Sequence, residues 1–209
     1  IYTGEDTLSL HDALPISFCM IKPDGVMRGV TGDIISRIER AGLKIVAMKM
    51  LVPTEAQVKA HYPVSDEAWV TRLGSKSLSS FENLSVTAEE ILGTTDKKTI
   101  GEDVVKNLIS FMTSGPVICM VVEGVQAVAM VRKLAGATLP FMAEVGTIRG
   151  DYSVDSPAVA NAQHRSIHNL FHASETLEEV EQEINVWFKG ETIHDYQLGN
   201  EATLYGKFY

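Results

Sequence analysis

The sequence predicts an α+β fold: a ferredoxin-like antiparallel sheet in the order β-α-β-β-α-β, with helices on one face and an inserted helical lobe. Three observations support this prediction. Four segments have the apolar or alternating pattern of strands, and two of the intervals between them have the apolar spacing of helices. The interval between the second and third strands contains Ser and Thr clusters and short helical patches. The length of 209 residues suits one domain with such an insertion.

A strand, a helix and a second strand open the fold. Residues 17–21 are an apolar run that ends in a turn-forming Lys-Pro-Asp-Gly cluster. Residues 33–40 have isoleucines at helical spacing, and an Ala-Gly pair stops this helix. Residues 43–52 alternate between apolar and polar side chains, which predicts a strand with one buried face. A Pro-Thr pair then starts a short helix that ends at residue 60.

The inserted lobe is predicted over residues 63–106, where helical patches are interrupted by turns. Residues 108–113 complete a helix before a Ser-Gly-Pro turn. The next strand, residues 117–122, is apolar at every position, which is typical of a strand buried on both faces. Residues 125–134 have helical apolar spacing, and a long loop over residues 135–150 follows.

Two elements complete the predicted core. Residues 169–173 are a short last strand, and residues 176–188 form an amphipathic helix. The main domain is therefore predicted over residues 17–209. Residues 1–16 lack periodicity, and the string DTLSLHDALPI resembles translated sequencing-adapter sequence. We expect this segment to be a non-native or disordered extension, with a genuine N-terminal extension as the alternative.

Composition limits the partners and the compartment. The formal net charge is −9, so the surface is expected to repel nucleic-acid backbones, and no nucleic-acid partner is expected. No apolar run reaches the roughly 18 residues that a membrane span needs, so no membrane partner is expected. Cys19 and Cys119 lie within apolar runs, which indicates buried, reduced thiols. Since the chain also starts without a signal-peptide pattern, we expect a cytoplasmic protein.

Any binding of phosphate groups must depend on cationic side chains, because the sequence contains neither a P-loop motif nor a GxGxxG motif. Three candidates lie at turns or beside glycines. Lys22 follows a strand, Arg132 lies on a predicted helix, and Arg149 stands in the segment GTIRG. Taken singly, each of the three is better explained as a solvated surface charge.

His172 is the strongest candidate for chemistry among the six histidines. It ends the last strand near the N-terminus of a helix, whose dipole favours phosphate, and Ser174 is a candidate N-cap of that helix. Glu183 borders the buried face of the helix, so it could hold one imidazole nitrogen and leave the other as a nucleophile. The alternatives are a satisfied, half-buried histidine and an ordinary surface glutamate. His164 and His168 have the spacing of a zinc pair but lack a third ligand, so no metal site is expected.

Four segments resemble the nucleoside diphosphate kinase family: MIKPDGVMRG, TSGPV, GTIRGD and NLFHASET. They occur in the order found in the family, the resemblance extends over residues 18–196, and the longer spacing before TSGPV is similar to the extended form of the family. The resemblance implies transfer of a γ-phosphate from a nucleoside triphosphate to a nucleoside diphosphate. The implied mechanism is ping-pong, with a phosphohistidine on His172. Glu183 would orient His172, either directly or together with Ser174.

The resemblance also implies a set of substrate contacts. The implied phosphate contacts are Lys22, Arg132, Thr138 and Arg149, and Tyr62 would lie near both the γ-phosphate and His172. Lys22 and Asn169 would contact the ribose. Val104 and Leu108 would contact the base. Because Val104 replaces an aromatic residue of the shorter family form, weak selectivity among bases is expected. The implied cofactor is Mg²⁺, which would bridge the phosphates and be held mainly by substrate and water.

The implied partners are nucleoside di- and triphosphates and further copies of the chain. The resemblance implies a homo-oligomer, either a tetramer or a hexamer, and residues 194–209 support this because their apolar side chains need burial. Three residues depart from the family pattern: Ala173 stands for a common Gly, Glu175 for a common Asp, and Leu139 for a common Asn.

Two other functions fit parts of the sequence. A regulatory nucleotide-binding module on the same fold would have lost catalysis, but His172 and Glu183 are both present. A nucleic-acid-binding β-α-β-β-α-β domain would need exposed aromatic side chains on the sheet and a basic face. The apolar strands and the charge of −9 argue against that second function.

Overall fold

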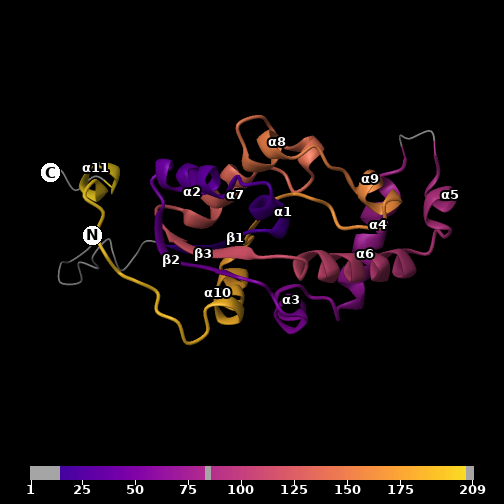
Figure 1. The fold of residues 1–209 in the computed structure, drawn as a ribbon, viewed down its shortest axis with the longest axis horizontal. Coiled ribbons are helices and arrows are strands. Elements are labelled where there is room, and N and C mark those ends of the chain that lie inside the picture. Colours follow the sequence, from indigo (N-terminus) through magenta and orange to yellow (C-terminus); the bar gives the residue numbers. More distant parts are fainter. Residues whose placement is uncertain (1–14, 83–85, 206–209) are drawn as a thin grey trace, which may run out of the picture.

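A four-stranded antiparallel sheet organises the chain in the computed structural model, which describes residues 15–82 and 86–205 (Figure 1). The strand order is β2-β3-β1-β4, and each neighbouring pair is antiparallel. The strands are β1 (Ile16–Ile21), β2 (Lys44–Leu51), β3 (Val117–Glu123) and β4 (Phe171–Ala173). The order of elements along the chain confirms the predicted α+β fold with its β-α-β-β-α-β core.

Helices cover both faces of this sheet (Figure 1). The two helices that connect the strands, α2 (Thr31–Arg40) and α7 (Ala127–Ala135), pack on one face as predicted. On the other face, α3 (Glu55–His61) and α10 (Leu177–Trp187) form a second layer that the prediction did not include. The second layer follows from the sequence of the central strands, because β1 and β3 are apolar on both sides and each side needs a cover.

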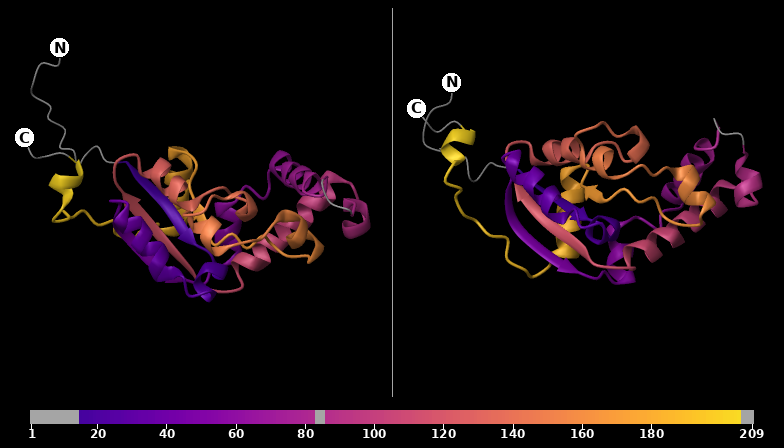
Figure 2. Two further views of the ribbon diagram at one scale, coloured as in Figure 1. Left: turned by 90° about the horizontal axis from the view of Figure 1, so that it is seen from above. Right: turned by 45° about the horizontal axis from the view of Figure 1, so that its top comes forward.

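The segment predicted as a lobe extends from one end of the sheet (Figure 2). It contains α4 (Glu67–Ser79), α5 (Ala88–Leu92) and the first part of α6 (Lys97–Met112), and α6 continues through residues 108–112, which were predicted to complete a helix. The lobe is therefore joined to the sheet by a continuous helix. The remaining helices are α1 (Pro23–Met27), η2 (Pro140–Met142), α8 (Ile148–Tyr152), α9 (Pro157–Ala162) and α11 (Glu201–Tyr205).

Helix α9 belongs to a stretch for which the sequence predicted no element. Its Ala158 packs with Phe81 and Ala88 in a small apolar cluster of its own, separate from the two clusters that lie against the sheet. The lobe thus combines two segments that are far apart in the sequence. Helix α9 itself has few large apolar residues, which explains why no periodic pattern predicted it.

The two ends of the described chain lie on the same side of the molecule (Figure 1). β1 begins at Ile16, which pairs with Glu123, so the sheet includes the last residue of the predicted N-terminal extension. Pro15 is also described, and its carbonyl oxygen accepts from the Gly124 N–H, while residues 1–14 of that extension lie outside the described residues. Within the described ranges, no helix combines the length and the apolar character needed to cross a membrane.

The C-terminal segment is tied to the edge strand β2 through a buried lysine. The Lys44 ammonium group pairs with Glu123 at 2.7 Å and donates to the Tyr196 carbonyl oxygen at 2.6 Å. The His194 backbone N–H donates to the Val46 carbonyl oxygen at 2.9 Å. Because an edge strand exposes unpaired backbone groups, this segment satisfies part of the β2 edge.

The contact between α4 and α6 depends on glycine, and this generates a test of the lobe. A Cβ atom on Gly101 would lie 2.1 Å from the Val70 carbonyl oxygen, whereas a Cβ on Gly32 of α2 would meet no atom within 4 Å. We expect Gly101→Ala to destabilise the protein by about 1–3 kcal/mol through overpacking. The control Gly32→Ala should be neutral or stabilising by up to about 1 kcal/mol. Urea denaturation measures both changes, and equal effects of the two variants would contradict the close packing.

Candidate active site

His172 and Glu183 form a short hydrogen bond at the centre of the molecule. His172 lies on β4, opposite Met20 of β1, and its Nε2 is 2.6 Å from Oε1 of Glu183 on α10. Glu183 is 4 % exposed, so its carboxylate has lost almost all contact with water. The Ser174 hydroxyl donates to the other carboxylate oxygen at 2.5 Å. Both carboxylate oxygens are therefore used within the protein.

Ser174 differs from its predicted role at the helix start. The N-cap of α10 is Thr176, whose hydroxyl accepts a hydrogen bond from the Glu179 backbone N–H at 3.3 Å. Ser174 is fully buried and turned towards Glu183, because two residues still separate it from the first turn of the helix. The prediction of Ser174 as the N-cap was wrong.

The surroundings of His172 hold its imidazole in the neutral form. Burial lowers the pKa of His172 to about 3, and the positive charges of Lys22 and Arg149 act in the same direction. Burial raises the pKa of the Glu183 carboxyl, an effect opposed by His61 and by the Ser174 hydrogen bond. A neutral imidazole carries one N–H, and Nε2 donates it to Glu183. The lone pair of Nδ1 is then available to act as a nucleophile.

Lys22, Asn169 and Thr138 are linked next to this histidine. The Lys22 ammonium group donates to Oδ1 of Asn169 at 2.8 Å, and Nδ2 of Asn169 donates to the Thr138 carbonyl oxygen at 3.0 Å. Lys22 is only 8 % exposed, and burial together with the nearby charge of Arg149 lowers its pKa to about 8. A buried cation that is repelled by a second cation is stabilised by any anion that binds between them.

Arg149 and Arg132 add positive charge from two other helices. Arg149 of α8 donates to the Gly136 and Phe171 carbonyl oxygens at 2.6 and 2.7 Å, and burial lowers its pKa to about 10. Arg132 of α7 is more exposed and pairs with Glu175 at 2.9 Å. Nε of Arg149 and the hydroxyl of Tyr62 are buried, and neither atom has a hydrogen-bond partner among the described residues. Such buried donors are satisfied when an anion or water binds.

The turn after β1 fixes the start of β4. Leu170 has a φ of +67°, a left-handed conformation that is uncommon for a residue with a branched side chain. Its N–H donates to Oδ2 of Asp24 at 2.9 Å, and its carbonyl oxygen accepts from the Lys22 N–H at 2.8 Å. A Cβ atom on Gly25 would come within 3.0 Å of that carbonyl oxygen, so glycine permits the close approach. Two hydrogen bonds therefore hold a strained residue two positions before His172.

The residues expected at the base lie further out on α6. Leu108 is partly buried against the apolar cluster on the α10 side of the sheet. Val104, one turn earlier, lines a small cavity of about 30 Å³ at the lobe, and the other lining residues are Leu92, Thr94, Ile100, Asp103, Asn107, Asn161 and His164. Contact of either residue with a base stays a prediction.

Sequence reasoning missed two buried residues near His172, namely His61 and Trp187. The centroids of the His61 and His172 rings are 4.5 Å apart, and the Trp187 indole N–H donates to Nδ1 of His61 at 3.2 Å. Two signals were present in the sequence. His61 directly precedes Tyr62, and Trp187 follows Glu183 by one helical turn, on the same face of α10.

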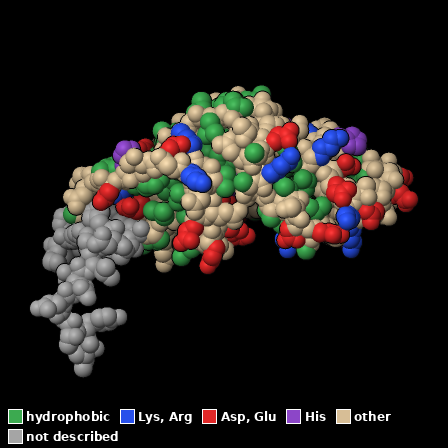
Figure 3. Space-filling view, turned by 90° about the horizontal axis from the view of Figure 1, so that it is seen from below, with side chains coloured by type: hydrophobic (Ala, Val, Ile, Leu, Met, Phe, Trp, Pro, Cys, Tyr) green, Lys and Arg blue, Asp and Glu red, His purple; other side chains and the backbone are tan. Residues whose placement is uncertain are grey.

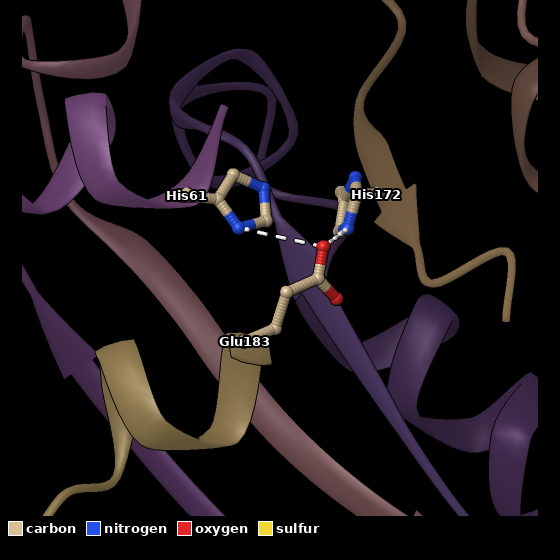
Figure 4. Close-up of side chains that lie close together, drawn as sticks. All are labelled: His61, His172 and Glu183. Carbon is tan, nitrogen blue, oxygen red and sulfur yellow. Dashed lines mark hydrogen bonds and ion pairs between the residues drawn. The ribbon is translucent and has the colours of Figure 1, made fainter. Parts of the chain in front are cut away.

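His61, His172 and Glu183 together form the group of side chains that could hold a metal ion, since their ligand atoms lie within 4.8 Å of one another (Figure 4). In the structure these atoms already have partners within the protein: His172 with Glu183, and His61 with Trp187. The group is thus explained as a hydrogen-bonded cluster. The cationic groups around Lys22 and Arg149 suit phosphate better than a bare cation, so a divalent cation fits here as the complex of a phosphate compound.

The comparisons with known proteins agree with this geometry. The sequence profile of the nucleoside diphosphate kinase family matches residues 16–73 and 78–193. A curated nucleoside diphosphate kinase of Pyrobaculum aerophilum is 45 % identical over 174 residues, which are 83 % of this chain and 94 % of the relative. The chain belongs to the nucleoside diphosphate kinase family. Membership assigns it nucleoside diphosphate kinase activity, a phosphotransferase activity on nucleotides.

Solved nucleoside diphosphate kinases have the same fold. The crystal structure of the enzyme from Pyrobaculum aerophilum has a TM-score of 0.80 at 42 % identity, covering 87 % of this chain and all of that one. A structure from Borrelia burgdorferi, described as a transition-state mimic with bound vanadate and ADP, has a TM-score of 0.73 at 38 % identity. It covers 92 % of this chain and 97 % of its own.

The lowered pKa of His172 predicts a specific loss of stability in acid. Between about pH 6.5 and 3 the unfolded chain binds a proton at this residue and the folded chain does not, so the free energy of unfolding should fall as the pH is lowered through this window. The contribution of this one residue is at most about 1.4 kcal/mol per pH unit. Urea denaturation at several pH values should therefore give a shallower fall for His172→Gln than for the wild type. Parallel curves would show that His172 titrates equally in both states.

Proposed function

We propose that this nucleoside diphosphate kinase transfers the γ-phosphate in two steps, with Nδ1 of His172 as the carrier. The observation that supports this most strongly is that the two ring nitrogens of His172 have different surroundings. Nε2 is held by the buried carboxylate of Glu183 at 2.6 Å, while Figure 4 draws the other ring nitrogen turned away from that carboxylate. A nucleophile with one nitrogen anchored and the other free has the arrangement that covalent catalysis needs.

In the first step, Nδ1 attacks the γ-phosphorus of a nucleoside triphosphate. The bond from that phosphorus to the β-γ bridging oxygen breaks, and the nucleoside diphosphate leaves with the bonding electrons. The phosphorylated ring becomes positively charged, and the Glu183 carboxylate stabilises this charge through the Nε2 proton. In the second step, a β-phosphate oxygen of another nucleoside diphosphate attacks the same phosphorus. The N–P bond breaks and neutral His172 is restored, which makes the mechanism ping-pong.

Binding and charge neutralisation would come from the cations beside His172. Phosphoryl transfer depends mainly on positioning and on neutralising the charge of the phosphate oxygens. Lys22 and Arg149 are suited to this because both are buried and mutually repelled, and Arg132 and Thr138 would extend the same group. Tyr62 would meet the γ-phosphate. We further propose that Lys22 and Asn169 bind the ribose, and that Val104 and Leu108 contact the base with little selectivity.

Mg²⁺ is the proposed divalent cation, carried by the nucleotide. It would draw negative charge from the phosphate oxygens, and its remaining ligands would be water. The side chains around the phosphates would then be donors: the ammonium group of Lys22, the guanidinium group of Arg149 and the hydroxyl of Tyr62. Because the nucleotide would bring the metal ion, the protein would supply cations and other donors to the phosphates rather than carboxylates.

A catalytically inactive, regulatory module is less well supported. Such a module needs the binding groups but not a histidine whose Nε2 is held by a fully used, buried carboxylate. A nucleic-acid-binding function is also disfavoured. On the face drawn in Figure 3, Lys and Arg side chains are scattered among acidic ones, so that face offers no continuous basic surface.

We propose that the chain assembles as a homo-oligomer, a tetramer or hexamer, in the cytoplasm. Two exposed apolar groups support assembly. Met48 and Met50 on the edge strand β2 are 53 % and 59 % exposed, and Phe141, Met142 and Val145 form a second group with exposures of 60 %, 62 % and 93 %. Exposed apolar groups of this kind are typical of subunit contacts. The buried free thiols of Cys19 and Cys119 are compatible with a reducing compartment.

Replacing the nucleophile tests the proposed function. We expect His172→Ala to abolish acid-labile phosphorylation of the protein by a radiolabelled nucleoside triphosphate, because one side chain carries the covalent step. Phosphopeptide mapping of the wild type should place the label on His172. The proposal would be refuted by turnover near the wild-type rate in His172→Ala, or by label on another residue of the wild type.

Replacing the anchor should separate rate from binding. We expect Glu183→Gln to slow transfer by a factor of roughly 10²–10³, because a neutral amide gives little stabilisation to the charged ring. Affinity for a nucleoside diphosphate should stay close to that of the wild type, since Glu183 does not face the phosphates. Single-turnover kinetics and equilibrium binding measure the two quantities, and an unchanged transfer rate would show that Glu183 has only a structural role.

A further inference from the structure

The proposed reaction leaves His61 without a role, although it is the closest aromatic neighbour of the nucleophile among the described residues. His61 is 6 % exposed and lies at the C-terminal end of α3. Its ring carries two polar nitrogens, and burying each of them without a partner costs free energy, so a purely apolar side chain would fill this space at lower cost. Its surroundings therefore need an explanation in terms of its two nitrogens.

Trp187 determines where His61 carries its proton. An indole N–H can only donate, so Nδ1 of His61 must accept the 3.2 Å hydrogen bond with its lone pair. Burial and the proximity of His172 and Lys22 lower the pKa of His61, which keeps the ring neutral. A neutral imidazole with an accepting Nδ1 carries its hydrogen on Nε2. The 3.5 Å approach of Nδ1 to Glu183 is then a contact and not an ion pair.

The Nε2 edge of His61 faces the ring of His172. The planes of the two rings meet at 77°, and Figure 4 shows His61 with the edge that bears its second nitrogen turned towards the face of His172. Nε2 of His61 is buried and has no conventional hydrogen-bond acceptor in the described part of the chain. An N–H directed at an aromatic face is a weak but directional interaction. It accounts for a buried donor that otherwise has no partner.

We propose that His61 is a positioning residue for the phosphorylation of His172: its N–H edge, set by Trp187, restrains the plane of the His172 ring. The inference rests on the proposed function of His172. Glu183 holds the His172 ring at one edge through Nε2, and His61 contacts one face of the same ring. Rotation about the bond from Cβ to the ring would break both contacts. Because Glu183 and Trp187 are one turn apart on α10, the same helix sets both restraints.

The test uses the full chain and two readouts that mere packing would not move. The first is the single-turnover rate of His172 phosphorylation, measured beside the affinity for a nucleoside diphosphate. We expect His61→Phe to reduce the rate by roughly tenfold or more with affinity within about twofold, since small misplacements of a reacting group are costly in rate. The second readout is the ¹⁵N chemical shifts of the His172 ring without nucleotide, which report its tautomer. We expect a single Nε2–H form in the wild type and a mixture of the two tautomers in His61→Phe, because a ring that can rotate loses its fixed hydrogen bond to Glu183.

Trp187→Phe provides a matched second variant. It keeps the aromatic packing on Phe18 but removes the N–H that sets His61, so we expect a smaller loss of rate in the same direction. The double variant should be no slower than His61→Phe, because Trp187 acts through His61. His194→Phe, which replaces an exposed histidine, is the control and should react at the wild-type rate.

Several results would overturn the inference. These are a wild-type phosphorylation rate in His61→Phe, an unchanged His172 tautomer, or additive losses in the double variant. If His61→Phe does not fold, Trp187→Phe decides: a lower rate at unchanged affinity supports the inference, and an unchanged rate overturns it. Failure of the proposed function is recognised separately, because the wild type itself would then form no phosphohistidine at His172.

Discussion

The hydrogen bond between His172 and the buried carboxylate of Glu183 is the interaction on which the site depends. A carboxylate that is 4 % exposed is costly unless every oxygen has a partner. His172 and Ser174 supply those partners: His172 lies on β4, and Ser174 directly follows its last residue. The need to satisfy one buried charge thus fixes the distance between the last strand and α10. The same bond engages Nε2 of His172 and leaves Nδ1 on the opposite side of the ring from Glu183 (Figure 4).

Much of the architecture could be predicted, because apolar residues recur in the sequence at the spacing of strands and helices. The four strands and the helices α2 and α7 have clear apolar spacing. Position at a strand end and on a buried helix face made His172 and Glu183 candidates, and the resemblance to the family paired them, as the hydrogen bond between them now does. The cations Lys22 and Arg149 could be proposed but not brought together. Their proximity depends on tertiary contacts, because Arg149 is held by the Phe171 carbonyl oxygen of β4 and β4 pairs with β1, and local sequence carries no signal for these contacts.

What could not be predicted involves side chains that satisfy one another across elements. Ser174 has the residue type of an N-cap, yet it bonds to Glu183, because the helix starts later at Thr176. The partnership of His61 and Trp187 joins α3 to α10 and has no local signature. Helix α9 buries only small residues against the lobe, so its amphipathic pattern is weak. In each case a tertiary contact determined the role of a residue whose type alone allowed several.

The turn after β1 has a consequence for how change can spread in this protein. Lys22 uses its side chain in the cationic group and its backbone N–H to hold Leu170, while Asp24 holds the other side of the same strained residue. The turn that carries the Lys22 cation and the backbone that orients His172 are therefore one mechanical unit. A sequence change in this turn cannot move the Lys22 cation independently of the angle at which His172 is presented. The N-terminal part of α6 lies outside this unit, so its sequence can change without altering the turn.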